Sequence, residues 1–221
     1  MIAETAAWLD TLYSNCSEDD GQLVVVHSSR KYPVAVHEVG NGKRLVEAAT
    51  QMHEFPGCYL KINLMDWDKI EQRRKRECKR AAVGGIKEVK TVVGVQLDVD
   101  AGKSEKYISR EHALHALSLM PLPVSLVINS NGELGGFHAY WLLESPYRIP
   151  NEAKRKQLQR VGKAWNEKLK SLCNGRLDST SNIDRVLRVV GVKRLDGGSV
   201  TLHSYHPDRL YNLNQFREAV R

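Results

Sequence analysis

The pattern of hydrophobic and polar positions divides the chain into short strand-like and longer helix-like segments. Strand-like runs lie near residues 22–27, 33–38, 58–63, 92–100, 124–129, 137–143 and 200–204. Helical periodicity appears near residues 2–15, 43–53, 71–80 and 109–120, after Pro150, and near 214–219. Because strands and helices alternate irregularly, the pattern predicts a mixed α/β (α+β) fold. A chain of 221 residues suffices for one domain or two closely packed lobes.

The strand-like run 92–100 ends in two aspartates, Asp98 and Asp100. Alternate residues of a strand share a face, so the two carboxylates lie on one side with their Cα atoms roughly 6.5 to 7 Å apart. Carboxylates this close repel each other and resist burial, and a divalent cation such as Mg²⁺ or Mn²⁺ removes both problems. The alternative is a pair of solvated acids at a strand end, since Ala101-Gly102 follows.

A histidine lies on the second strand of a predicted hairpin. The runs 124–129 and 137–143 are joined by an Asn-Gly and Gly-Gly connection, which is typical of a hairpin. His138 shares a face with Tyr140. The glycines at 135–136 would let a phosphate approach the backbone and the imidazole. A hydrogen-bonded structural histidine is the alternative.

A third segment, 176–194, combines acids with cations. Asp178 follows Leu177, and the cations that come after it are Arg185, Arg188, Lys193 and Arg194. Arginine forks suit phosphate oxygens, and an aspartate can complete a metal shell, so the segment suits a metal-bound polyphosphate. Asp184 is a second candidate for that acid. The alternative is an aspartate that caps a short amphipathic helix with a solvated basic face.

In order, the three segments resemble the motif set of the archaeo-eukaryotic primase superfamily, the primase-polymerases of the plasmid, phage and bacterial type. That pattern is hydrophobic-Asp-x-Asp, then Ser-x-His or Gly-x-His, then hydrophobic-Asp followed by Arg-x-x-Arg-x-x-Gly. The matching residues are 97–100, 136–138, 177–178 and 185–191, and the resemblance covers roughly residues 57 to 210. Gly136 replaces the serine, and 190–194 departs from the family's Pro-Gly-Thr and Asn-x-Lys.

The resemblance implies one primase-polymerase catalytic domain over residues 1–221. It would have a first lobe of about 1–88 and a catalytic lobe of about 89–221 built like an RNA-recognition module. The implied activity is template-dependent nucleotidyl transfer, as a DNA primase or DNA polymerase with two Mg²⁺ or Mn²⁺ ions. The implied partners are a single-stranded DNA template and primer, NTP or dNTP substrates, and a helicase or other replication protein in cis or in trans.

The resemblance also assigns roles to residues. The implied metal ligands and catalytic acids are Asp98, Asp100 and Asp178, with Asp178 preferred over Asp184 by its distance from Arg188. The implied nucleotide-binding residues are His138, Gly136, Arg185, Arg188 and Lys193.

Charge points to a polyanionic partner. The formal net charge is +7 and the isoelectric point is about 9.2. The segment 71–80 carries six cations in ten residues, and we expect these to contact nucleic-acid phosphates: Arg73, Arg74, Lys75, Arg76, Lys79 and Arg80. The cations of the helix after Pro150 are as well explained by a solvated face.

Cysteine usage and hydropathy exclude other classes. The four cysteines have no Cys-x-x-Cys spacing, so the sequence predicts neither a zinc ribbon nor a disulfide framework. No leader and no membrane-spanning run is recognisable, which predicts a cytoplasmic protein with no membrane contact. Two alternative functions stay open: a replication-initiator or single-stranded nucleic-acid binding module with the same fold, and a repair or terminal-transferase-type polymerase.

Overall fold

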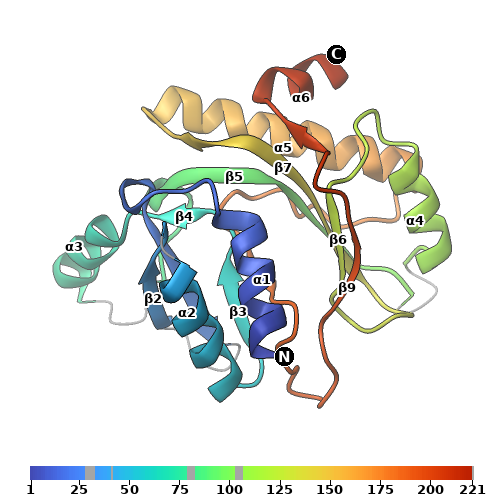
Figure 1. Ribbon diagram of the computed structural model, residues 1–221. Helices are drawn as coiled ribbons and strands as arrows, with labels where there is room; N and C mark the ends of the chain where they lie inside the picture. Colours follow the sequence, from blue (N-terminus) through green and yellow to red (C-terminus); the bar gives the residue numbers. More distant parts are fainter. Residues whose placement is uncertain (28–32, 41, 79–82, 103–106, 221) are drawn as a thin grey trace. The chain divides into compact units, whose positions relative to one another are not determined.

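The computed structural model of the chain describes residues 1–27, 33–40, 42–78, 83–102 and 107–220. It has the mixed α/β fold that the hydrophobic pattern predicts (Figure 1). The helices are α1 (Ile2–Tyr13), α2 (Gly42–Glu54), α3 (Trp67–Glu77), α4 (Arg110–Ser118), α5 (Glu152–Leu172) and α6 (Leu213–Ala219), with 3-10 turns η1 (Glu18–Asp20) and η2 (Ile86–Glu88). The strands are β1 (Gln22–His27), β2 (Pro33–Glu38), β3 (Cys58–Lys61), β4 (Leu64–Met65), β5 (Val89–Val99), β6 (Leu126–Asn129), β7 (Phe137–Arg148), β8 (Val186–Arg188), β9 (Thr201–Tyr205) and β10 (Leu210–Tyr211).

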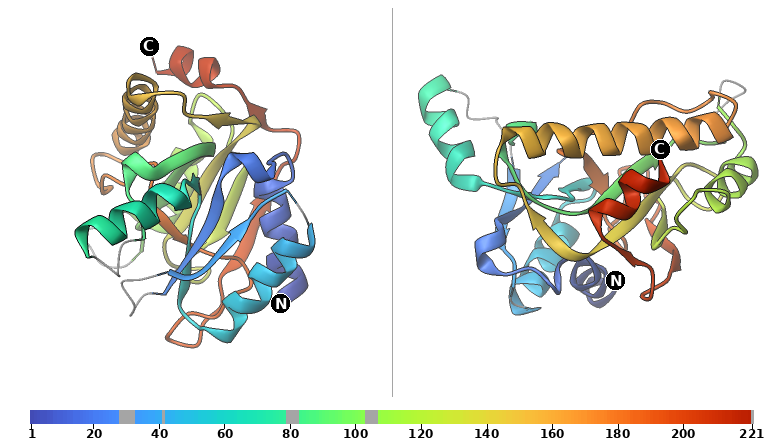
Figure 2. Two further views of the ribbon diagram at one scale, coloured as in Figure 1. Left: turned by 90° about the vertical axis from the view of Figure 1, so that its left-hand side faces the viewer. Right: turned by 90° about the horizontal axis from the view of Figure 1, so that it is seen from above.

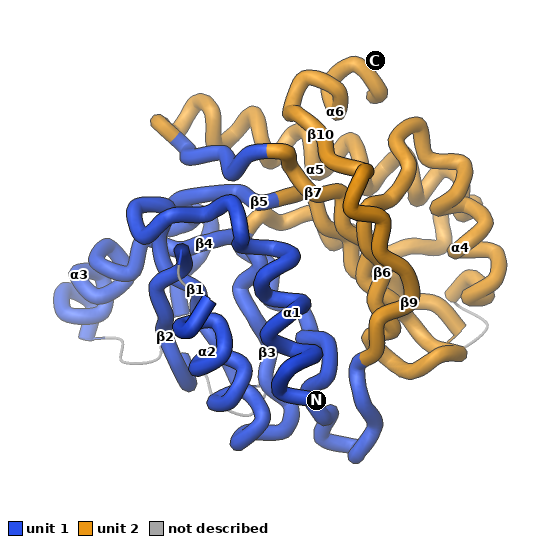
Figure 3. Tube along the Cα trace, viewed as in Figure 1, with its two compact units in different colours: residues 1–93, 145–149, 184–200 blue, residues 94–144, 150–183, 201–221 orange. Residues whose placement is uncertain are grey.

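The chain forms two compact units, each assembled from three stretches of sequence (Figure 3). Unit 1 contains residues 1–93, 145–149 and 184–200, and unit 2 contains 94–144, 150–183 and 201–221. This differs from the expected lobes of about 1–88 and 89–221, because the chain returns to unit 1 twice after leaving it. The second return matters for function, since 184–200 carries three of the expected nucleotide-binding residues.

Unit 1 is built on an antiparallel sheet. Its strand order is β8-β3-β1-β4-β5, and β2 also pairs with β1. Helices α1 and α2 pack against each other. The apolar stripe of α1 is buried, and at its end the Tyr13 hydroxyl donates to the Ile62 carbonyl at 2.8 Å. Burial, followed by the charge of nearby Cys16, raises the pKa of this phenol well above its ordinary value, so Tyr13 is a neutral core residue.

Unit 2 has one helix-covered sheet face. Its strand order is β5-β7-β6-β9, and β10 runs parallel to β7. Alternation along β7 separates Trp141 from His138. Trp141 packs edge-on against Trp165 of α5 with ring centroids 5.4 Å apart, and α5 extends along β7 (Figure 2). His138 and Tyr140 lie on the opposite face of β7, so the candidate chemistry occupies the face that α5 leaves uncovered.

The alternative of a capped amphipathic helix after Asp178 is wrong. The chain turns at 183–184 and enters β8, which pairs antiparallel with β3 in the register Tyr59↔Arg188. The aliphatic run 186–190 is as compatible with a strand as with a helix, and long-range pairing decides between them. The predicted hairpin is confirmed, with β6 and β7 antiparallel and Ile128 opposite His138.

Candidate functional site

Asp98 lies at the end of β5, and Asp100 directly follows the strand. Val99 between them is 1% exposed, whereas the Asp98 side chain keeps 22% of its surface exposed and Asp100 is half-buried. Both carboxylates belong to unit 2. Their partial exposure leaves the oxygens accessible to a ligand from one side.

His138 lies beside Asp98 and is 3% exposed. Its Nε2 atom is 3.5 Å from Asp98 Oδ1, and its Nδ1 atom is 3.4 Å from the Tyr140 hydroxyl. A tyrosine hydroxyl can donate to Nδ1, and the imidazole proton then resides on Nε2 and faces the carboxylate. Tyr140, which alternation already places on this face, is therefore the residue that can set the histidine tautomer.

The segment that carries Asp178 is fixed to the backbone of Asp98. The Thr180 hydroxyl lies 3.0 Å from the Asp98 carbonyl oxygen and accepts from the Asp98 N–H at 3.3 Å. Asn166 of α5 holds the same segment, since its Oδ1 accepts from Thr180 N–H at 3.3 Å and its Nδ2 donates to the Asp178 carbonyl at 3.4 Å. The structure thus brings the first and third sequence segments together within unit 2.

Thr180 and Asn166 were missed by the sequence reasoning. Thr180 is 3% exposed and Asn166 is 3% exposed, so both are polar residues buried to position a backbone. An asparagine within the apolar stripe of the α5 sequence is a signal that could have drawn attention to it, because buried amides need partners. Nothing in the run Ser179-Thr180-Ser181 distinguishes the middle residue.

The acids fit a metal with few protein ligands. Among the described residues, no three histidine, cysteine, aspartate or glutamate side chains form a group that could hold a metal ion, and the Asp178 side chain is exposed. Mg²⁺ commonly takes only one or two carboxylates and completes its shell with water and substrate phosphates. Asp98 and Asp100, as hard oxygen donors, fit that kind of site.

The two glycines before His138 pack against backbone. A Cβ on Gly136 would lie 2.7 Å from the Val99 carbonyl oxygen, and one on Gly135 would lie 2.5 Å from the Asn131 carbonyl oxygen. Such distances exclude a side chain, so close strand packing explains these glycines. A phosphate contact to the Gly136 backbone stays a prediction.

The expected phosphate-binding cations lie in unit 1. Arg188 and Lys193 line a pocket of about 180 Å³, where the Arg188 guanidinium is 5.5 Å from the centre of the Tyr59 ring. Arg194 lines the same pocket and is ion-paired with Asp196. Arg185 is half-buried immediately before β8.

Asp184, the alternative third acid, has a structural partner. Lys61 Nζ donates to the Asp184 carbonyl at 2.5 Å and lies 3.8 Å from its Oδ2 atom. Burial lowers the pKa of Lys61, although the charges of Asp184 and Glu88 act in the opposite direction. Asp184 therefore serves to neutralise a buried lysine.

The basic segment divides into residues with different surroundings. Arg73 forms an ion pair of 3.1 Å with Glu88, whose side chain is 8% exposed. Arg74 is half-buried, while Lys75 and Arg76 are exposed on α3. Lys79 and Arg80 lie outside the described residues.

The chain has the fold of an archaeo-eukaryotic primase domain. A solved structure with a similar fold is the archaeo-eukaryotic primase domain of the primase-polymerase of cyanophage S-2L, at a TM-score of 0.57 and 16% identity. The alignment covers 99% of this chain and 97% of that one. No family model and no curated protein matches the sequence. In the described ranges, no helix is long and apolar enough to cross a membrane.

Proposed function

We propose that the protein is a template-dependent nucleotidyltransferase, a DNA primase or DNA polymerase that makes or extends primers. The observation that carries the proposal is the joining of Asp98, His138 and the 178–180 segment on one strand end of a primase-type fold. The three motifs, spread over about eighty residues of sequence, contribute to this strand end, and in this proposal each would supply a group of the type that phosphoryl transfer requires.

In this proposal Asp98 and Asp100 hold Mg²⁺ or Mn²⁺, with Asp178 as a further ligand. The bound ions would supply Lewis acidity at the transferring phosphoryl group and lower the pKa of the attacking 3′-hydroxyl. His138, with its proton on Nε2, would orient the Asp98 carboxylate, and a contact from His138 to the triphosphate is part of the proposal. Thr180 fixes the backbone from which the Asp98 side chain projects.

The nucleotide is proposed to contact cations and backbone from the third segment and the hairpin. Arg188 and Lys193, in the pocket beside Tyr59, would neutralise the triphosphate, with Arg185 and the Gly136 backbone as further contacts. The nucleic-acid partners are a single-stranded template and a primer, and a helicase or other replication protein is a further proposed partner.

The test is incorporation of labelled nucleotides on a defined template with Mg²⁺ or Mn²⁺, with and without a primer. We expect wild type to incorporate nucleotides and Asp98→Asn/Asp100→Asn to lose the activity. Asp10→Asn/Asp208→Asn removes two exposed carboxylates and is the matched control. Incorporation that survives the Asp98/Asp100 substitution would reject the metal-ligand assignment.

The same assay separates the related activities. Product with a template but no primer identifies a primase, and product only with a primer identifies a polymerase. Elongation that ignores the template sequence identifies a terminal transferase. Parallel reactions with NTPs and dNTPs give the substrate preference.

A second candidate is a replication-initiator or single-stranded nucleic-acid binding module with this fold. It is supported by the net charge of +7 and by the exposed cations Lys75 and Arg76 of α3, which could contact phosphates without a bound metal. Single-strand binding that needs no divalent ion, together with no incorporation under any of these conditions, would establish this function in place of the first.

A further inference from the structure

Helix α3 buries very little of itself. Of its eleven residues only Ile70 is buried. The Ile70 side chain packs closely against Gly84, since a Cβ added to this glycine would lie 2.6 Å from Ile70 Cδ1. The helix begins at the N-cap Asp66, whose side chain accepts from Lys69 N–H. Most helices are stabilised by packing an apolar face, so α3 presents an unusually large share of its surface to solvent.

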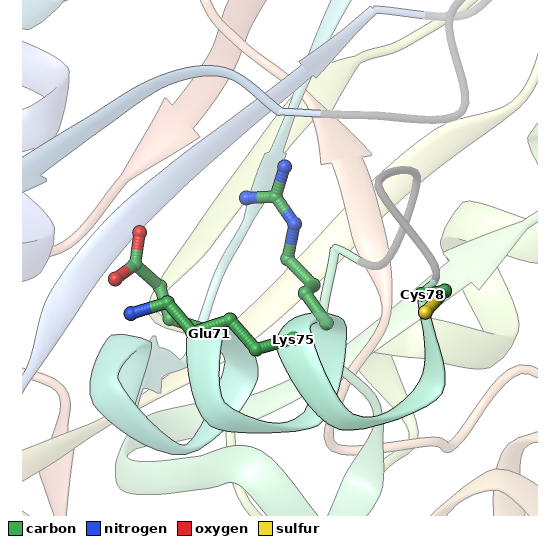
Figure 4. A pocket seen from close by; sticks show the side chains of 4 residues that line it. Glu71, Lys75 and Cys78 are labelled. Atoms are coloured by element: carbon green, nitrogen blue, oxygen red, sulfur yellow. The ribbon is translucent and has the colours of Figure 1, made fainter.

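Two cations of α3 are among the residues that line a pocket of about 450 Å³ (Figure 4). The described residues that line it are Glu71, Arg74, Lys75 and Cys78. Arg73, which is ion-paired with Glu88, is not one of these residues. The pocket is within the range of about 300 to 1,000 Å³ found for sites that bind small ligands.

The described part of the lining carries two cations and one acid, and so a net positive charge. The Arg74 guanidinium lies 5.5 Å from the centre of the Trp67 ring, which limits its freedom. Within the described residues, neither Arg74 nor Lys75 forms an ion pair. Cations near the C-terminus of a helix are also stabilised by the helix dipole. The dipole accounts for their position along the helix, but it does not require that they line a pocket.

We propose that this pocket binds one nucleotide unit of a single-stranded nucleic acid through its phosphodiester, with Arg74 and Lys75 as the phosphate donors. The proposal rests on the proposed function only for the identity of the partner. Its two phosphate donors belong to the expected contact surface of residues 73–80, and Arg73, which is paired with Glu88, is not one of them.

Cys78 provides a direct probe of the pocket. It caps α3 with a left-handed backbone (φ 53°) and is exposed, whereas the other three cysteines are buried. Burial raises the pKa of Cys16 to about 12, with a further contribution from Asp20, and burial raises that of Cys173 to about 11. The thiolate is the reactive form, so native alkylation should modify Cys78 first.

The experiment measures the rate of Cys78 alkylation by iodoacetamide, using peptide mass spectrometry on the full chain. We expect a saturating single-stranded oligonucleotide to slow the reaction at least about fivefold, and inorganic phosphate or a nucleoside triphosphate at the same concentration to leave it unchanged. Protection by the triphosphate alone would overturn the proposal in favour of a free-nucleotide site. An unchanged rate with an oligonucleotide that binds by fluorescence anisotropy would also overturn it.

Substitutions test the two cations separately. The slope of the logarithm of the single-strand binding constant against the logarithm of salt concentration counts phosphate contacts. Arg74→Gln and Lys75→Gln should each reduce the magnitude of this slope by about 0.7, the value for one lost phosphate contact. Lys69→Gln removes the same charge from α3 outside the pocket and should leave the slope unchanged. Equal effects of all three substitutions would reject a localised site in favour of general electrostatics.

Protection of Cys78 from alkylation can be measured without catalytic turnover. A protein that protects Cys78 but incorporates no nucleotide would retain this site and lose the proposed polymerase function. Incorporation without Cys78 protection would give the reverse result, so the two proposals fail separately.

Discussion

Units 1 and 2 both place charged side chains in or beside their strands, but they neutralise these charges differently. In unit 1, the side chains of Lys61 and Glu88 are 6% and 8% exposed, and each is paired, Lys61 with Asp184 and Glu88 with Arg73. In unit 2, Asp98 stays 22% exposed beside His138, which is 3% exposed. Breaking a buried pair leaves an uncompensated charge, so the unit 1 cluster has a structural role. The partly exposed acids of unit 2 are suited to an external cation.

The largest expected effect comes from Asp98→Asn. If the carboxylate serves a metal, primer extension should fall by about a thousandfold or more, which corresponds to about 4 kcal/mol of transition-state stabilisation. The free energy of unfolding without metal should not fall, because one of two neighbouring repelling charges is removed. Extension kinetics and urea unfolding measure the two quantities. A large loss of stability would instead make Asp98 structural.

The converse is expected for Glu88→Gln. Glu88 accepts from Gly85 N–H at 2.7 Å and pairs with Arg73, whose side chain is 27% exposed. Because Arg73 retains some hydration, we expect a loss of about 2 kcal/mol in unfolding free energy, below the range for a fully buried pair. Glu18 and Arg44 form an exposed ion pair with 3.9 Å between Oε1 and Nη2. Glu18→Gln should therefore lower the free energy of unfolding by less than about 0.5 kcal/mol. Equal effects in urea unfolding would remove the distinction between the two environments.

Tyr140→Phe tests the tautomer of His138. The hydroxyl lies 3.4 Å from Nδ1, and a hydrogen bond of this kind contributes about 0.5 to 1.5 kcal/mol. Because the distance is long, we expect only about a threefold loss of extension rate at saturating nucleotide. Tyr205→Phe, at an exposed tyrosine, is the control. No change with Tyr140→Phe would show that the phenol does not set the histidine proton.

Local patterns predicted much of this molecule, and long-range pairing decided what they left open. The bounds of β1 and β2 and the hairpin of His138 follow from alternation and turn chemistry, which act within a few residues. The strand after Asp184 did not follow, since β8 exists through its pairing with β3. Arg73 and Arg74 differ in their surroundings because Glu88 lies beside Arg73. The sequence alone does not distinguish among the six cations of residues 73–80.

A smaller effect on stability than that of Glu88→Gln is expected at Asp20, which holds residues 145–149 within unit 1 through Arg148. Its Oδ1 accepts from Arg148 Nε at 2.5 Å and its Oδ2 from Ser17 N–H at 2.7 Å. Burial alone would raise the pKa of Asp20, but the hydrogen bonds from Arg148 and Ser17 outweigh burial and hold this pKa below its ordinary value.

A carboxyl with a depressed pKa adds stability above its unfolded pKa, and that stability is lost as pH falls through the folded value. Asp20→Asn should therefore lower the free energy of unfolding by about 1 kcal/mol at pH 7, a typical contribution for a capping residue. As pH falls below the unfolded pKa of about 3.9, the difference from wild type should shrink, and it should disappear below the lower folded pKa, where the wild-type carboxyl is neutral in both states. Urea unfolding across pH 2.5 to 7 measures it. If the difference in unfolding free energy between the two proteins stays constant over this range, the contribution of Asp20 comes from packing and not from its charge.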